Sequence, residues 1–238
     1  MPPTEGEAAV GTPRATLSRE IIVKAALQAI DESGPEGLTM RALGQRLGVQ
    51  AMSLYGYVTG REDLLEAVVS HLLEGLTENL DGQLSQSWQG YLQALAHQVR
   101  AIVVEHPSAF PLVATRHPAT PWLRPPLRSV ALVEDLLANL SASGFNDDQL
   151  VGAYRSFSSF LLGQLLLEAA TRGANTSPVE EPLDEGDADI ANRDDNVDLS
   201  QAPLVTRLRP MLSEDHSAEE FEIGLETLLN RLEMELSQ

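Results

Sequence analysis

The apolar positions of residues 38–58 recur at helical spacing and predict two short helices joined by a tight turn. The turn falls at Gly48, where a residue with positive φ is needed to end the first helix. Gly44 lies one turn earlier, at the inward position where a larger side chain would hold the two helices apart. The apolar side chains that would close this unit are Met40, Leu43, Leu47, Val49, Leu54 and Val58. The pattern is that of a helix-turn-helix, whose second helix enters the major groove of DNA.

Polar residues mark where the neighbouring helices begin. Ser18 is expected to cap a first helix, and Thr39 is expected to cap the first helix of the motif. Thr59 and Glu62 have the spacing of a capping box for the helix that follows the motif. The apolar face of that helix is too wide for a small head alone, so we expect it to join the head to a body.

The rest of the chain predicts a helical body. The expected helices cover residues 87–106, 110–115, 127–143, 146–172 and a last helix from Ser217 onward. Asn146 with Gln149, and Ser217 with Glu220, have the spacing of capping pairs at the starts of the two longest of these helices.

Two stretches lack this periodicity. Residues 1–16 are rich in Pro, Gly, Ala and Thr and are expected to form a disordered arm. Residues 175–203 hold nine acidic residues against Arg193 and are expected to form a flexible acidic connector. The sequence therefore predicts an all-α fold, with a three-helix helix-turn-helix domain at 17–62 and a helical domain at 63–238.

Composition and charge narrow the class of protein. The 238-residue chain has no cysteine, which excludes disulfides and thiolate metal sites. No stretch reaches the roughly 18 unbroken apolar residues of a membrane span, so we expect a cytoplasmic protein with no membrane partner. The net charge is −19, but residues 14–61 hold six basic and four acidic residues and are net +2. An acidic body under a weakly basic head is compatible with DNA binding by the head.

The run from Leu54 to Leu65, LYGYVTGREDLL, resembles the end of the DNA-binding domain in the TetR (tetracycline repressor) family. The resemblance is strong over residues 17–73 and weaker over 87–116 and 150–236. It implies a ligand-responsive transcription regulator, most simply a repressor. Such a protein binds a palindromic double-stranded DNA operator as a homodimer and is released by a small-molecule effector. Its C-terminal domain binds the effector and forms the dimer.

The motif and the resemblance together give a set of DNA-binding residues. Those expected to face base edges are Gln50, Ala51, Met52 and Ser53. Arg41 matches a position that reaches a guanine in tetracycline repressors. The expected phosphate contacts are Thr39, Tyr55, Tyr57 and Arg61. Two alternatives stay open, in which Tyr55 packs against the first helix and Arg61 pairs with a neighbouring carboxylate.

The positions that bind the magnesium–tetracycline chelate in tetracycline repressors are not retained. Leu112 stands where the metal-binding histidine would be, and leucine cannot ligate a hard cation. The body instead offers apolar residues and a few polar anchors, which predicts a mainly hydrophobic effector. The predicted effector residues are Leu95, Val99, Phe110, Leu112, Arg116, His117, Phe157, Phe160, Gln164 and Glu168. The alternative for each apolar member is an ordinary place in the core.

The last two long helices match those that pack as a four-helix bundle between two subunits of the resembled family. The predicted dimer-interface residues on them are Tyr154, Leu161, Phe221, Leu225, Leu228 and Leu232. The alternative is that this apolar face packs within one chain.

The sequence supports neither catalysis nor a bound metal or other cofactor. The five histidines show no metal-ligand spacing with one another or with carboxylates. A P-loop, a nucleophile elbow and a dinucleotide fingerprint are all missing from the sequence. We therefore expect a protein that is not an enzyme. The remaining alternative is a ligand-binding or protein-interaction module whose helix-turn-helix is only structural.

Overall fold

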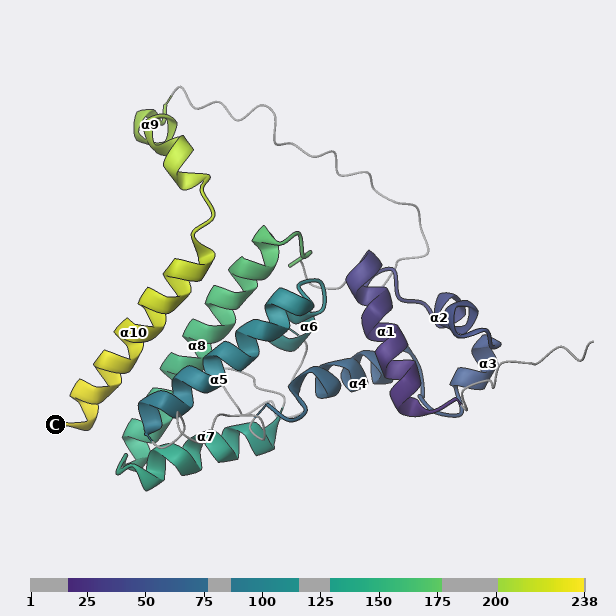
Figure 1. The fold of residues 1–238 in the computed structure, drawn as a ribbon, viewed down its shortest axis with the longest axis horizontal. Coiled ribbons are helices and arrows are strands. Elements are labelled where there is room, and N and C mark those ends of the chain that lie inside the picture. Colours follow the sequence, from purple (N-terminus) through teal and green to yellow (C-terminus); the bar gives the residue numbers. More distant parts are fainter. Residues whose placement is uncertain (1–16, 77–86, 116–128, 177–200, 238) are drawn as a thin grey trace, which may run out of the picture.

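The helices form an elongated molecule with a small head, a larger body and one connecting helix between them (Figure 1). The computed structural model describes residues 17–76, 87–115, 129–176 and 201–237. These residues form ten α-helices and no strand, which confirms the all-α class. The head consists of α1 (Arg19–Ser33), α2 (Met40–Leu47) and α3 (Ala51–Leu54), and α4 (Arg61–Leu73) leads into the body. The remaining helices are α5 (Trp88–Glu105), α6 (Phe110–Thr115), α7 (Val130–Ala142), α8 (Asp147–Thr171), α9 (Pro203–Leu212) and α10 (Ser217–Leu236).

Side-chain caps fix several helix starts where the sequence predicts them. The side-chain oxygens of Ser18 and Thr39 each accept a hydrogen bond from the backbone amide three residues on, at 3.2 and 3.1 Å. Asn146 and Gln149 form the predicted capping box at the start of α8. Each cap satisfies a backbone amide that has no partner inside its helix.

The predicted capping box at α4 is wrong. Gly60 is the N-cap of α4 and supplies no side chain. The carboxylate of Asp63 instead accepts a hydrogen bond from the Thr59 amide at 2.8 Å, and Arg19 of α1 holds that carboxylate at 2.8 Å. Because the N-cap is Gly60, one residue later than predicted, the third residue of α4 is Asp63 and not Glu62.

The predicted cap at α10 is also wrong. The helix begins at Ser217, but His216 occupies the N-cap position. Ser217 donates from its amide and its hydroxyl to the Asp215 carboxylate and so acts as a donor.

The helix α9 is not among the predicted helices. It begins at Pro203, the last residue of the predicted acidic connector. Proline suits the first helical position because the amide it lacks would have no partner there. Residues 177–200 of the connector, and the predicted arm at residues 1–16, lie outside the described part of the chain.

The core of the body forms where α5, α6, α7 and α10 pack around α8 (Figure 1). Trp88 of α5 meets Phe145 edge-on, with ring centroids 5.2 Å apart. The Tyr91 hydroxyl donates to Asp135 of α7 at 2.6 Å, and burial together with that carboxylate raises the pKa of Tyr91. By length and composition alone α8 could cross a membrane, but its apolar side chains are the surface on which the other body helices pack.

A buried carboxylate ties three body helices together. Glu168 of α8 is 1% exposed. Arg100 of α5 donates to it from Nε and Nη2, both at 2.9 Å, and Arg172 adds a third bond at 2.9 Å. The Arg100 guanidinium also lies 5.2 Å from the ring centroid of Phe221 on α10.

Gly224 allows α10 to approach α8, and we expect Gly224→Ala to destabilise the body. A Cβ at this position would lie 2.6 Å from Cε2 of Phe160, so the ring or the helix must shift. Such overpacking costs about 1–3 kcal/mol. Gly152→Ala on α8 is the matched control: its Cβ meets no described atom within 4 Å, and the helix gains about 0.5–1 kcal/mol. Urea unfolding should shift in opposite directions, and equal shifts would contradict the close approach.

Candidate DNA-binding and effector sites

The two motif helices touch backbone to backbone. Gly48 has the left-handed conformation at φ 67°, and the next amide, of Val49, donates back to the Gly44 carbonyl at 2.9 Å. A Cβ on Gly44 would lie 3.0 Å from the Val49 oxygen and 3.1 Å from the Ala51 nitrogen. The predicted close crossing at Gly44 is therefore confirmed, and it holds the start of α3 against α2.

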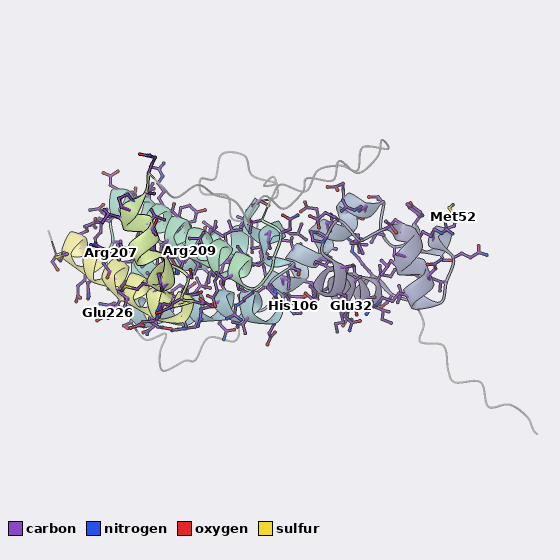
Figure 2. The ribbon with its side chains drawn as sticks, turned by 90° about the horizontal axis from the view of Figure 1, so that it is seen from above. Glu32, Met52, His106, Arg207, Arg209 and Glu226 are labelled. Carbon is purple, nitrogen blue, oxygen red and sulfur yellow. The ribbon has the colours of Figure 1, made fainter. Side chains whose placement is uncertain are left out.

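This crossing leaves the first residues of α3 facing outward. Met52 is 75% exposed and lies at the end of the head that is farthest from the body (Figure 2). Gln50 and Ser53 are also exposed, while Ala51 is half-buried beside Gly44. The inward positions of the motif are closed by Leu54 and Val58, which are buried.

Most of the basic side chains of the head bind acidic side chains or carbonyl oxygens of the head itself. Lys24 contacts Glu20 at 2.6 Å, and Arg46 contacts Glu32 at 2.6 Å. These hydrogen bonds lower the pKa of Glu20 and of Glu32. Arg19 and Arg61 are also bound within the head.

Arg41 differs from these four basic residues. It is exposed in the first turn of α2 and has no ion pair or hydrogen bond from its guanidinium among the described residues. Its charge is therefore available to a partner outside the head.

The predicted phosphate contacts occupy different environments. Tyr55 and Tyr57 are 47% and 39% exposed, so each presents part of its ring to solvent. Thr39 uses its hydroxyl to cap α2. Arg61 donates from Nε to the Leu38 carbonyl at 3.0 Å and from Nη2 to the Pro35 carbonyl at 2.7 Å.

Sequence reasoning missed two residues that hold the motif in place. Arg19 donates to the Tyr57 carbonyl at 2.7 Å and pairs with Asp63. The Arg19 bond lowers the pKa of Asp63, and the Thr59 amide adds to that shift. These partners lie 38 and 44 residues from Arg19, so no local spacing could have indicated them.

The predicted apolar effector residues lie on α8 and on α5 and α6, each of which packs against α8. Five of the residues are buried and Phe160 is half-buried: Leu95, Val99, Phe110, Leu112, Phe157 and Phe160. Gln164 is half-buried on α8. The predicted residues Arg116 and His117 lie outside the described residues.

Glu168 needs a correction as an effector anchor. Both of its carboxylate oxygens accept hydrogen bonds from Arg100 or Arg172. Because this buried charge is already paired, an effector would have to displace an arginine to reach it.

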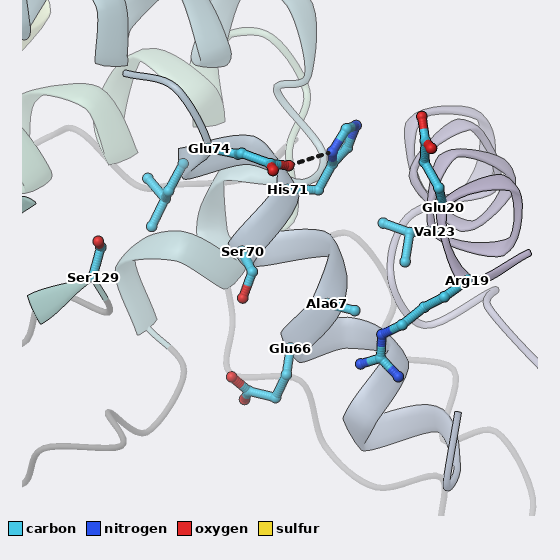
Figure 3. A pocket seen from close by; sticks show the side chains of 10 residues that line it. Arg19, Glu20, Val23, Glu66, Ala67, Ser70, His71, Glu74 and Ser129 are labelled. Atoms are coloured by element: carbon cyan, nitrogen blue, oxygen red, sulfur yellow. Dashed lines mark ion pairs between the residues drawn. The ribbon is translucent and has the colours of Figure 1, made fainter. Parts of the chain in front are cut away.

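A cavity of about 910 Å³ opens between α1, α4 and the start of α7 (Figure 3). Its wall carries the carboxylates of Glu20, Glu66 and Glu74, and His71 contacts Glu74 at 3.5 Å. Its described lining includes none of the predicted effector residues, and its three carboxylates do not suit a hydrophobic effector. A second cavity, of about 220 Å³, lies between the end of α4 and α5.

The head contacts the body at points other than α4. Nδ1 of His106, which follows α5, lies 2.8 Å from Oδ2 of Asp31 on α1. Asn175, beyond the end of α8, donates to Glu36 in the α1–α2 turn at 3.2 Å. A movement in the body can therefore reach the head directly as well as through α4.

The predicted dimer-interface residues need a correction too. Tyr154, Leu161, Phe221, Leu225 and Leu232 are all buried within this one chain, and Leu228 is half-buried. The helices α8 and α10 of one chain pack against each other, and α5, α6 and α7 also pack against α8, so these side chains are covered within the chain.

A three-helix head with an outward-facing α3 on an all-helical body defines a helix-turn-helix regulator. Two family models match it: bacterial regulatory proteins of the tetR family over residues 22–68, and the tetracyclin repressor-like C-terminal domain over residues 81–236. The chain belongs to the TetR family.

Individual relatives agree with this assignment. Tetracycline repressor protein class D of Escherichia coli is 27% identical over 223 residues, which cover 94% of this chain and 92% of that protein. The HTH-type transcriptional repressor DrrR1 of Streptomyces coeruleorubidus is 28% identical over 236 residues, covering 95% and 81%. A solved structure of a possible TetR family regulator from Streptomyces coelicolor A3(2) aligns with TM-score 0.69 at 30% identity, covering 91% and 99%.

The family assignment gives the general function. The protein is a DNA-binding, ligand-responsive transcriptional repressor and not an enzyme. The alternative of a purely structural helix-turn-helix is therefore not retained.

Proposed function

We propose that this repressor binds a palindromic operator as a homodimer in the cytoplasm and is released by a small, mainly hydrophobic effector. The observation that carries the DNA-reading part is the state of Arg41. Among the basic residues of the described head, it is the one whose charge is not used internally. It is also in α2, which packs directly against the outward-facing helix α3.

The proposed roles follow from exposure. Gln50, Met52 and Ser53 at the start of α3 would face base edges, and Met52 offers apolar contact to a thymine methyl. Arg41 would reach a guanine from α2. Tyr55 and Tyr57 would contact phosphates on either side, fixing the orientation of the head on the duplex.

A second copy would cover an exposed face of α8 and α10. On α8 this face contains Val151, Arg155, Ser159, Gly163 and Leu167, which recur every four residues. On α10 it contains Ile223, Thr227 and Met234. We propose these residues in place of the buried set, because exposed side chains that are mostly small or apolar, on two adjacent helices, suit a two-fold helix bundle. The apolar residues of α9 are exposed as well, which also favours a partner chain.

The effector would enter the apolar region where α5, α6 and α8 meet. Aliphatic and aromatic side chains there offer no ligand for a hard cation such as magnesium, which supports a hydrophobic compound. Displacement of α6 or α8 would then act on the head through α4 and through the His106–Asp31 contact. The effector must bind the state that does not bind DNA more tightly, since a ligand without that preference shifts nothing.

Operator binding by Arg41→Ala tests the DNA-reading role. Loss of a base-reading arginine is expected to weaken binding to the operator by about 5- to 150-fold, which corresponds to roughly 1–3 kcal/mol. Fluorescence anisotropy with a duplex from the protein's own upstream region, with competitor DNA present, measures this. Arg46→Ala is the matched control, because Arg46 is already paired with Glu32 on the surface and should change binding by less than about threefold. Equal effects of the two substitutions would reject the assignment.

Substitution on the outer face of α10 tests the dimer. Ile223→Glu with Met234→Glu is expected to weaken self-association at least about 100-fold, because each charge would be buried without a partner. Sedimentation measures the change, and circular dichroism should show unchanged helix content. Val104→Glu on α5, whose side chain is 47% exposed outside this face, is the control. A double variant that stays dimeric would reject this interface.

A further inference from the structure

Arg61 is the first residue of α4, and its side chain points into the head. Its side chain is 23% exposed, and its two short hydrogen bonds go to main-chain oxygens of the α1–α2 turn. Its remaining charged contact, from Nη1 to Glu62, is 3.5 Å long. The guanidinium is therefore turned toward the turn that precedes α2.

The carbonyl oxygens that accept these bonds belong to the turn just before α2. Leu38, whose carbonyl accepts from Nε, is 1% exposed and directly precedes Thr39, the N-cap of α2. Pro35, three residues earlier, accepts from Nη2. Fixing both oxygens fixes the path of the chain into α2, and Arg41 is only two residues beyond the N-cap.

We propose that Arg61 is a positioning residue for DNA reading and not a phosphate contact. It holds the α1–α2 turn against α4, and so keeps α2 and Arg41 in the orientation that reads the operator. This inference rests on the proposed DNA-reading role of Arg41. Arg19 and Asp63 have the corresponding role at the other end of the motif, where Arg19 binds the Tyr57 carbonyl and Asp63 binds the Thr59 amide.

The same contact makes Arg61 a coupling element. It is a residue of α4, the helix that joins head to body, and it also forms hydrogen bonds with the turn before α2. A rotation of α4 would therefore carry the start of α2 with it. Lysine is not equivalent, because its single ammonium nitrogen lacks the planar pair of donors, Nε and Nη2, that bind the two carbonyl oxygens.

Arg61→Lys separates the two roles, because it keeps the charge and removes the fork. As a positioning residue, Arg61 should not be replaceable by lysine: Arg61→Lys and Arg61→Ala should both weaken operator binding, by about 10- to 30-fold. The slope of log affinity against log salt should match that of the wild type. If Arg61 contacts phosphate, Arg61→Lys will bind nearly as the wild type does, and Arg61→Ala will lower the slope by about one. That result would overturn the proposal.

Hydrogen exchange in the free protein gives a readout that does not need DNA. Both variants should raise the exchange of amides in residues 36–48, while the amides of α8 keep their wild-type rates. Unchanged exchange at 36–48 in both variants overturns the proposal, and so does raised exchange with unaltered operator binding. If the wild type itself fails to bind its upstream duplex, the proposed operator is rejected, while the exchange experiment still decides whether Arg61 holds α2.

Discussion

Glu168→Ala is expected to lower the free energy of unfolding by about 3–5 kcal/mol, the usual cost of removing one partner from a buried ion pair. The substitution removes three hydrogen bonds of 2.9 Å. It also leaves Arg100, whose side chain is 19% exposed, without its carboxylate partner. Since Arg100 also stacks on Phe221, the contact between α5 and α10 should loosen. Chemical denaturation followed by circular dichroism measures the loss.

The double variant Arg100→Met with Glu168→Leu is the control for this prediction. Apolar replacement of both partners often costs little, because no charge is left buried. The double variant should therefore be more stable than Glu168→Ala alone. If the single and double variants lose the same stability, the charge pair is not the source of the effect.

The pH dependence of this effect has a defined sign. Burial alone raises the pKa of Glu168, but hydrogen bonds from Arg100 and Arg172 outweigh it and leave the pKa below its ordinary value of 4.5. A carboxyl group with a lowered pKa contributes stability that is present above pH 4.5 and is lost as the pH falls through its folded pKa. The difference between wild type and Glu168→Ala should therefore be constant near neutral pH and shrink in acid.

Gly44→Val is expected to reduce operator binding by about a thousandfold, toward the level of non-specific DNA binding. A Cβ on Gly44 would crowd the Val49 oxygen and the Ala51 nitrogen, which belong to the backbone and cannot rotate away. The side chain would push α3 off α2, so Gln50, Met52 and Ser53 would all leave their positions together. Anisotropy titration with and without competitor DNA distinguishes specific from non-specific binding.

Two further variants control for the effect of Gly44. Gly44→Ala should give a smaller loss than Gly44→Val, because crowding grows with side-chain size. Gly60→Ala, where a Cβ meets no described atom within 4 Å, should change binding by less than about threefold. Specific binding retained by Gly44→Val would show that the crossing of α2 and α3 tolerates separation.

Most of the DNA-reading head could be predicted from the sequence, because its signals are local. Gly48 ends α2, Thr39 begins it, and Leu54 and Val58 close the motif, and each signal depends on residues within one or two helical turns. The capping box at Asn146 was predictable for the same reason. The candidate DNA-reading residues followed from this register and from the family resemblance.

The contacts between distant segments were decided only by the tertiary structure. Arg61 reaches Leu38 across 23 residues, Arg19 reaches Asp63 across 44, and Arg100 reaches Glu168 across 68. No periodicity records such pairs, because they depend on which helix faces which after packing. For the same reason the sequence assigned Phe221 and Leu225 to a partner chain, although α8 and α10 of one chain bury them. Local spacing thus determined the motif and every described helix except α9, while packing determined which charges are used internally and which face remains for a partner.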